Sequence, residues 1–171
     1  MHIETNRLVI TQFQPSMAYE VHINSLDEDN RRFVPDEVFE TEEEAADTIA
    51  FLMGCYEGED GPLVYPILLK GGPCIGYVQA IPLDGKEWEI GYHIGGLYTK
   101  QGYATEAVTA FLPVIMGQIG IAHITGICLV ENQASVKVME RCGFQKQFEG
   151  MGSYQGSLQQ ICRYVYRLPQ A

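Results

Sequence analysis

The sequence predicts an α/β fold of the α+β kind, with one mixed, mostly antiparallel sheet of about six to seven strands and helices on both faces. A length of 171 residues suits one hydrophobic core, and the apolar share of 46% is ordinary for a globular protein. The predicted order is strand, two helices, three strands, helix, strand, helix and two strands, without the uniform βαβ repeat of a parallel sheet. Because no repeat or low-complexity linker divides the chain, we expect a single domain over residues 1–171.

The N-terminal third predicts one strand and two helices around an acidic connection. Pro15 suits the first turn of a helix, and Thr41 with Glu44 matches a capping box at the start of the next. The expected apolar face of this second helix consists of Ala45, Ile49, Leu52, Met53 and Tyr56. The predicted elements are a strand at 7–13, a helix from 15 to about 25, a loop or short helical turn at 26–39, and a helix from 41 that ends at 58–62.

The remaining sequence predicts a three-stranded antiparallel meander, followed by helices and strands in alternation. Pro113 falls inside a helical pattern and predicts a kink or an early end of that helix. Gly143 suits the left-handed position that follows a helix. The predicted elements are strands at 64–69, 74–81 and 88–94, a helix at 105–116, a strand at 121–130, a helix at 132–142, and strands at 144–149 and 161–168 joined by a glycine-rich stretch at 150–156.

The charge of the chain is strongly negative, with a net value of −11. No basic patch of the kind that binds nucleic acid is present, so we expect no nucleic-acid partner. Acidic residues concentrate in segment 27–60, where only Arg31 and Arg32 are basic. Such a surface attracts cationic partners such as amines or basic peptides, although a solvated face that keeps the protein in solution explains the same residues.

The sequence indicates a cytoplasmic protein without a membrane segment. No apolar run reaches the roughly 20 residues that span a bilayer, and the N-terminus lacks the pattern of a signal peptide. The five cysteines are widely spaced and contain no C-x-x-C pair. This argues against a disulfide framework and against a zinc site, so we expect reduced thiols and no metal.

Residues 97–107 join a predicted strand to a predicted helix and form a possible anion site. The first N–H groups of a helix have no partner within it, and the helix dipole places partial positive charge there. Gly102 allows close approach to the backbone. A phosphate-bearing cofactor and a plain connection between two elements both explain the stretch. The dinucleotide fingerprint is missing, since no early strand leads into G-x-G-x-x-G with an acid about 20 residues on.

Several short motifs, in register with the predicted elements, resemble the GNAT acetyltransferases. The motifs are Thr5-Asn6-Arg7-Leu8, Glu89-Ile90-Gly91-Tyr92, Gly102 to Ala107, Asn132-x-x-Ser135, and Glu140 to Phe144. Within the superfamily, the chain is most similar to the ribosomal-protein N-acetyltransferase branch of the RimJ/RimL type. The resemblance implies acetyl-CoA as donor, held in a V-shaped gap between the fourth and fifth predicted strands (88–94 and 121–130), and direct transfer to an amine in a ternary complex.

The resemblance also implies which residues bind acetyl-CoA. Main-chain groups of His93 and Ile94 would contact the pantetheine arm, together with Asn132 and Ser135. The pyrophosphate would lie on Gln101, Gly102, Tyr103, Ala104 and Thr105. The chain departs from the family pattern at Thr99, where glutamine or arginine is common, and at Lys100, where glycine is common. The Lys100 ammonium can pair with a phosphate.

Candidate catalytic residues follow from the same resemblance and from the chemistry of amines. Ser135 is our candidate general acid for the departing thiolate, because Met139 stands where many relatives have a tyrosine. An amine also needs a general base. Glu89 and His93 share one face of a strand by the period of two, and Glu131 is a third candidate. The sequence leaves the choice of base open.

The acceptor is expected to be a cationic amine, either a protein N-terminus or a small molecule. Two other hypotheses remain open. Met139 and Thr99 are compatible with a non-catalytic acyl-CoA-binding module that acts as a sensor or binds a partner. A nucleotide-phosphate enzyme that uses the same loop is the other. A homodimer is possible through an edge strand among the last two strands.

Overall fold

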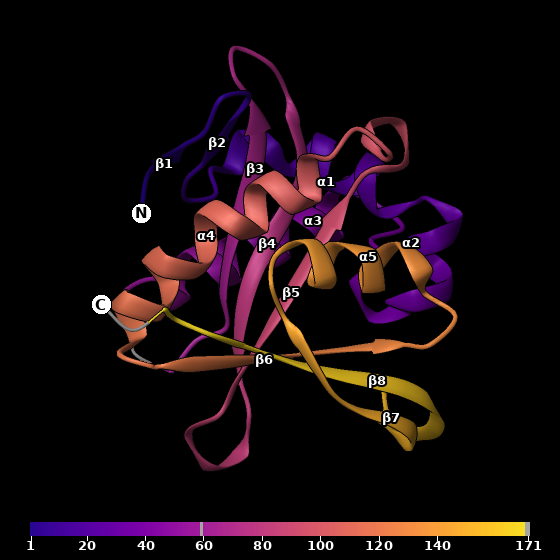
Figure 1. Ribbon diagram of the computed structural model, residues 1–171. Helices are drawn as coiled ribbons and strands as arrows, with labels where there is room; N and C mark the ends of the chain where they lie inside the picture. The colour runs from indigo at the N-terminus through magenta and orange to yellow at the C-terminus, as the bar shows by residue number, and fades with distance from the viewer. Residues whose placement is uncertain (59, 170–171) are drawn as a thin grey trace.

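One sheet runs through the computed structural model, which describes residues 1–58 and 60–169 (Figure 1). Glu59, a member of the acidic segment 27–60, lies outside the described residues. The strands are β1 Ile3–Glu4, β2 Leu8–Ile10, β3 Leu63–Leu69, β4 Cys74–Pro82, β5 Trp88–Ile94, β6 His123–Leu129, β7 Gln145–Tyr154 and β8 Ser157–Arg167. Their order is β1-β2-β3-β4-β5-β6-β8-β7, and every pair is antiparallel except β5 with β6.

The predicted mixed, mostly antiparallel sheet is therefore confirmed, with eight strands rather than six to seven. The additional strand is β1, whose two residues are too few to show an alternating pattern. The strand predicted at 7–13 is shorter than expected and ends at Ile10. The meander of β3, β4 and β5 is confirmed, with Tyr65 opposite Val78 and Val78 opposite Tyr92.

Helices cover both faces of the sheet, as expected. They are α1 Ala18–Ser25, α2 Glu28–Phe33, α3 Glu42–Cys55, α4 Tyr103–Ile119 and α5 Gln133–Arg141, with short 3-10 turns that include η2 Pro35–Glu37. In Figure 1, α4 crosses the front of the sheet while α1 and α3 lie behind it. The connection at 26–39 thus holds a short helix and a turn. None of the described helices is long and apolar enough to cross a bilayer.

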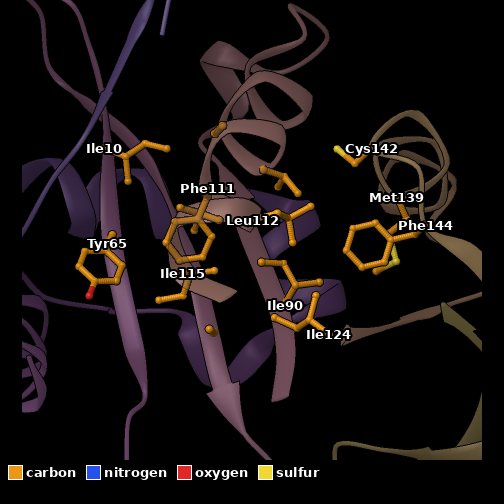
Figure 2. Close-up of a cluster of buried hydrophobic side chains, with 14 of the residues drawn as sticks. Ile10, Tyr65, Ile90, Phe111, Leu112, Ile115, Ile124, Met139, Cys142 and Phe144 are labelled. Atoms are coloured by element: carbon orange, nitrogen blue, oxygen red, sulfur yellow. The ribbon is translucent and has the colours of Figure 1, made fainter. Parts of the chain in front are cut away.

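The main core lies between α4 and the sheet. Figure 2 shows Phe111, Leu112 and Ile115 of α4 against apolar side chains of the strands, among them Ile90. Of the kink or early end predicted at Pro113, the early end is wrong, because α4 continues to Ile119. Phe111, Leu112 and Ile115 around it are buried, and their packing outweighs the one N–H bond that a proline removes.

The helix caps explain where α3 and α5 begin. Thr41 accepts a hydrogen bond from the Glu44 N–H at the start of α3, as the capping box predicts. The Glu44 carboxylate instead binds the N–H of Glu40. The buried face of α3 omits Met53, which is 37% exposed, so that member of the predicted face is wrong. The Gly143 prediction is confirmed by a φ of 86° directly after α5.

The C-terminal hairpin is longer than predicted. The glycine-rich stretch 150–156 was expected to be a loop, but most of it belongs to β7, so this prediction is wrong. Gly152 is needed within the strand, because a Cβ there would lie 2.4 Å from Ile161 Cδ1. The turn itself is only Gln155 and Gly156, both with positive φ, as in tight hairpins.

The sheet splits between β5 and β6. These strands share a single paired position, Glu89 with Thr125, and Figure 1 shows β6 leaving β5 at a steep angle. Each strand continues in full register with its other neighbour, β5 with β4 and β6 with β8. The expected V-shaped gap between the fourth and fifth predicted strands is therefore confirmed, and it opens toward the C-terminal end of β5.

Candidate active site

A cavity of about 310 Å³ lies at this split. Residues from several separate segments line it, so chain folding rather than local sequence assembles the site. The polar or titratable residues at its wall are Glu37, Tyr77, Gln79, Glu89, Tyr92, Cys128, Asn132, Ser135, Ser153, Tyr154 and Gln155. The three sequence candidates Glu89, Asn132 and Ser135 are thus brought together, whereas Glu131 is exposed and paired with Arg32 at 2.9 Å.

Glu89 has the protonation behaviour that a general base needs. Burial raises the pKa of this carboxyl to about 7, and the neighbouring Glu37 carboxylate adds to the rise. The charge of Arg163 and a backbone N–H at Ile127 oppose it. A carboxyl with a pKa close to neutral can accept a proton from an ammonium group and release it to water again.

Ser135 and Tyr92 form a hydroxyl pair on the other side of the cavity. Asn132 Oδ1 accepts the Ser135 N–H at 3.1 Å, which caps α5 and fixes the first turn of the helix. The Tyr92 hydroxyl lies 2.9 Å from Ser135 Oγ and donates to the Ser135 carbonyl oxygen at 3.0 Å. Burial raises the pKa of Tyr92, so the phenol keeps its proton. The serine hydroxyl therefore has a second proton donor beside it.

Glu89 and Tyr92 face opposite sides of β5, since they are three residues apart on a strand. They border one cavity only because β6 has separated from β5 at this point. A base on one face and a hydroxyl donor on the other are thus available to a reacting group placed in the gap. This arrangement suits a reaction that removes a proton from a nucleophile and gives one to a leaving group.

His93 occupies a different environment from Glu89. Its Nε2 lies 3.0 Å from Asp27 Oδ2, and its ring packs near that of Tyr77. Asp27 also caps α2 by accepting the Asn30 N–H. The imidazole is absent from the described residues that line the cavity. Its side chain therefore links β5 to α2, while its backbone remains part of the β5 edge.

The outer edge of β5 is open to a ligand. After Glu89, no described residue of β6 pairs with residues 90–94. On the other side, His93 and Ile94 pair with β4. The N–H and C=O groups that point into the gap can therefore bind amides of an extended ligand in the manner of an added strand.

The loop before α4 leads into a helix N-terminus with free N–H groups. The N–H of Glu106 makes the first helical bond, to the carbonyl of Gly102, so the N–H groups of Tyr103, Ala104 and Thr105 precede the hydrogen-bonded turns. Gly102 has a φ of 82°. Lys100 also adopts a positive φ, 62°, which costs a non-glycine residue roughly 1–2 kcal/mol. The lysine thus keeps the backbone shape that glycine would give.

The Thr5 to Leu8 motif supports this loop from the other end of the chain. Arg7 Nε donates to Glu106 Oε2 at 2.7 Å, and its Nη1 donates to the Gln101 carbonyl at 2.9 Å. Thr5 donates to the second oxygen of Glu106 at 2.6 Å. The guanidinium also lies 4.3 Å from the centre of the Tyr103 ring. The first turn of α4 and the loop before it are therefore fixed to the segment between β1 and β2.

These features fit acetyl-CoA, the cosubstrate that the family resemblance implies. A helix N-terminus with a glycine and a lysine suits a pyrophosphate, and the open edge of β5 suits a chain of amides. Within residues 1–58 and 60–169, no group of three or more His, Cys, Asp or Glu side chains is arranged to hold a metal ion.

Among the residues that sequence reasoning did not select are Arg7 as a support of the loop, and Glu37, Gln79 and Tyr92 at the cavity. Arg7 and Tyr92 lie in motifs that were noticed, but only the fold shows what they contact. Glu37 was one of many acids in segment 27–60, and no spacing distinguishes it from the others.

Comparisons with known proteins agree with this geometry. The family model described as an acetyltransferase (GNAT) domain matches residues 7–145. The chain is 30% identical to the uncharacterized N-acetyltransferase YnaD of Bacillus subtilis, over 86% of this chain and 84% of that protein. It resembles the crystal structure of a GNAT-family acetyltransferase from Bacillus anthracis, with a TM-score of 0.82, 26% identity and coverage of 98% of both chains. It has the fold of RimL, a ribosomal-protein acetyltransferase solved with coenzyme A, with a TM-score of 0.82, 18% identity and 98% coverage of both chains.

Proposed function

The chain belongs to the GNAT family of acetyltransferases, and on that premise we propose that it moves the acetyl group of acetyl-CoA to a primary amine within a ternary complex. The observation that carries the proposal is the placement of Glu89 and Ser135 on opposite sides of one cavity, where the sheet splits. The acceptor class comprises protein N-termini, such as that of a ribosomal protein, and small cationic amines. The enzyme would act in the cytoplasm, which fits its five free cysteines.

We propose that two main-chain surfaces hold acetyl-CoA. The loop and first turn of α4, from Lys100 through Gln101, Gly102, Tyr103 and Ala104 to Thr105, would bind the pyrophosphate. The edge of β5 at His93 and Ile94 would bind the pantetheine amides, with Asn132 and Ser135 beside the thioester. Support comes from the N–H groups at the start of α4 and from the unpaired side of β5. A RimL structure with coenzyme A has the same fold.

The residues then divide the proton transfers between them. Glu89 takes a proton from the incoming ammonium, and the freed nitrogen lone pair forms the new C–N bond as the C–S bond of the thioester breaks. Ser135 gives its hydroxyl proton to the departing sulfur, supported by the Tyr92 hydroxyl at 2.9 Å. The proton that the new amide nitrogen loses restores the serine. Glu89 afterwards returns its proton to water, which its pKa of about 7 permits.

The choice of Glu89 over His93 rests on their surroundings. The Glu89 carboxyl borders the cavity, whereas the His93 imidazole is bound to Asp27 outside it. Met139, whose presence motivated a non-catalytic alternative, is 2% exposed, packs in the core and also borders the cavity, where it can donate no proton. The Tyr92 hydroxyl at the same cavity can supply the donor that Met139 lacks.

The test is an acceptor screen read by mass spectrometry, with acetyl-CoA and a panel of amines and basic peptides. We expect acetylation of at least one amine, with a loss of rate in Glu89→Gln and in Ser135→Ala. Tight binding of acetyl-CoA without acetylation of any amine, and no effect of Ser135→Ala, would support the acyl-CoA-binding module instead. A thermal-shift ranking that places NAD or ATP above CoA would support a nucleotide-phosphate enzyme.

We also propose that the enzyme forms a homodimer through the C-terminal hairpin. β7 is the last strand of the sheet, and its outer side has no strand partner within the described part of the chain. Phe148, Met151 and Leu158 of this hairpin are exposed apolar side chains. An exposed edge with apolar residues favours pairing with a second copy. Sedimentation velocity should show a dimer that Phe148→Lys with Met151→Lys converts to monomer.

A further inference from the structure

Glu37 places a second carboxylate at the wall of the cavity, beside Gln79 of β4. Gln79 Nε2 donates to its Oε1 at 3.1 Å. Its Oε2 is buried and has no hydrogen-bond partner among the described residues. A buried carboxylate oxygen without a donor is costly, so such an atom in a binding cavity indicates a partner supplied by the ligand.

The position of Glu37 is fixed by its neighbours. Asn30 Nδ2 donates to the Glu37 carbonyl at 3.1 Å and to the Ser25 carbonyl at 2.9 Å, which ties η2 to the end of α1. Gly91 makes room for the Gln79 side chain, because a Cβ at this glycine would lie 2.6 Å from Gln79 Nε2. The carboxylate is therefore held in place before any ligand arrives.

The described wall of the cavity carries acidic side chains and no basic one. Glu37 and Glu89 are acidic, and no Lys, Arg or His belongs to the described residues that line it, so Arg163 and His93 act on the two carboxyls only from outside the wall. Burial raises the pKa of the Glu37 carboxyl. A cationic group beside Oε2 would favour the ionised form and supply the missing hydrogen bond. Glu37 and Glu89 can thus each bind one ammonium group of a ligand in the cavity.

The cavity favours a small ligand over the end of a folded protein. The tip of the β7–β8 hairpin is joined to the end of α2, since Tyr154 Oη and Gln155 Nε2 both donate to the Phe33 carbonyl, at 2.9 and 3.3 Å. Residues on both sides of this bridge, Val34 and Tyr154 among them, line the cavity. The bridge therefore narrows the approach on the acceptor side.

We propose that Glu37 determines acceptor specificity, because its unpartnered oxygen binds the second ammonium group of a small diamine whose first amine is acetylated beside Glu89. The inference rests on the proposed function and narrows its acceptor class. Of the acidic residues in segment 27–60, only Glu37 contributes to the described cavity wall. The cationic preference would therefore come from this one carboxylate rather than from the acidic surface as a whole.

The test compares putrescine with n-butylamine, which has the same carbon chain and one amine fewer. We expect wild type to prefer putrescine by about tenfold or more in kcat/KM, the effect of one charge-assisted hydrogen bond. Glu37→Gln keeps the shape and the bond to Gln79 but removes the charge, so the preference should fall about tenfold. The control is Asp36→Asn, which removes the same charge from the exposed neighbouring residue and should leave the preference unchanged.

A second measurement does not depend on turnover. With CoA present, putrescine should raise the melting temperature of wild type and of Asp36→Asn, and should no longer raise that of Glu37→Gln. Equal preference ratios in wild type and Glu37→Gln would overturn the inference while leaving the acetyltransferase intact. So would a clear preference for peptide N-termini over both amines. A wild type that acetylates no amine in any arm would instead overturn the proposed function, and the inference with it.

Discussion

The two sides of the gap are built from different parts of the chain and from different chemical groups. On the side that we propose binds acetyl-CoA, here called the donor side, the loop before α4 and the edge of β5 present main-chain N–H and C=O groups. On the side that we propose binds the amine, here called the acceptor side, the wall consists of side chains from separate segments, including Glu37, Glu89 and Tyr154. The donor side therefore depends on backbone shape, whereas the acceptor side depends on the identity of each side chain.

This difference explains why substitutions have unequal consequences on the two sides. Lys100 replaces the glycine that the family resemblance implies at its position, yet the loop has a left-handed conformation there. A backbone site tolerates such changes as long as φ and ψ are preserved. On the acceptor side, replacing one carboxylate changes the charge of a small enclosed space, where electrostatic effects are stronger than at the surface. Variation on this side would change the acceptor rather than the donor.

The most severe test of the donor side is Gly102→Val. A β-branched residue at a φ of 82° must move the backbone and with it the N–H groups at the start of α4. We expect the affinity for acetyl-CoA to fall by about a hundredfold or more, the loss of two or three hydrogen bonds to a charged group. Isothermal titration calorimetry with acetyl-CoA measures it.

Gly120→Val is the matched control for this variant. Gly120 ends the same helix with a φ of 70° in open space, so the backbone strain is similar but lies at the opposite end. Binding should therefore be unchanged in Gly120→Val, while both variants lose some thermal stability. Retained binding in Gly102→Val would mean that the loop is a plain connection and that the donor binds elsewhere.

Glu89→Gln tests the acceptor side. Loss of the proposed general base should lower kcat about a hundredfold, with little change in the affinity for acetyl-CoA. In wild type, kcat/KM should rise with pH through about 7, because burial and Glu37 raise the pKa of Glu89 to that value and only the ionised form accepts a proton. The exposed Glu87→Gln is the control. A Glu89→Gln enzyme with the wild-type pH profile would return the role of base to His93 or to water.

The two sides also differ in how far the sequence predicts them. The loop at 97–107 is one contiguous stretch, and the rule that a helix N-terminus binds anions applies to it without knowledge of the fold. Glu89, Asn132 and Ser135 were selected because each lies in a motif beside a predicted element. The apolar spacing of each helix likewise predicts its buried face from local sequence. Pro113 is the exception, because the burial of residues before and after it overcame the propensity of proline to end a helix.

Glu37 and Gln79 could not have been chosen in this way. Their contact joins positions 42 residues apart, and it depends on the absence of a side chain at Gly91 on a third element. The same holds for Arg7 and Glu106, which are 99 residues apart. Sequence spacing predicts which residues share a face of one element, but the approach of different elements is decided by packing across the sheet.

The stability of Glu89→Gln should show the cost of keeping an ionised carboxyl at the gap. Folding raises the pKa of the Glu89 carboxyl from 4.5 to about 7, so its protonated form stabilises the folded state. This contribution to stability is fully present below about pH 4.5 and is lost as the pH rises through 7. Relative to wild type, the variant should gain about 1–3 kcal/mol in free energy of unfolding between about pH 5 and pH 8. Urea denaturation at both values measures this. A constant difference would show that Glu89 is ionised throughout.

Ser135→Ala should have a smaller effect than Glu89→Gln. The Tyr92 hydroxyl, 2.9 Å from Ser135 Oγ, remains as a proton donor when the serine is removed. We expect kcat to fall about tenfold in Ser135→Ala and in Tyr92→Phe, and about a hundredfold in the double variant, if each hydroxyl supplies part of the proton transfer. Rates measured by thiol release give the comparison. If kcat is unchanged in both single variants and in the double variant, water rather than either hydroxyl protonates the sulfur.

The smallest expected effect is that of Arg7→Lys. This variant tests whether Arg7 holds the loop before α4 in the conformation that binds acetyl-CoA. A lysine keeps the positive charge but cannot bind Glu106 and the Gln101 carbonyl together with the planar fork of the guanidinium. If Arg7 acts by holding the loop, the Kd for acetyl-CoA should rise about threefold to tenfold, the cost of one or two weakened hydrogen bonds. Arg31→Lys changes a similar two-nitrogen pair with Glu40 on the exposed surface of α2, and should leave the Kd unchanged.

An unchanged Kd in Arg7→Lys would mean that charge alone matters there. The donor side would then depend on a side chain in the same way as the acceptor side, and the contrast between them would rest on β5 alone.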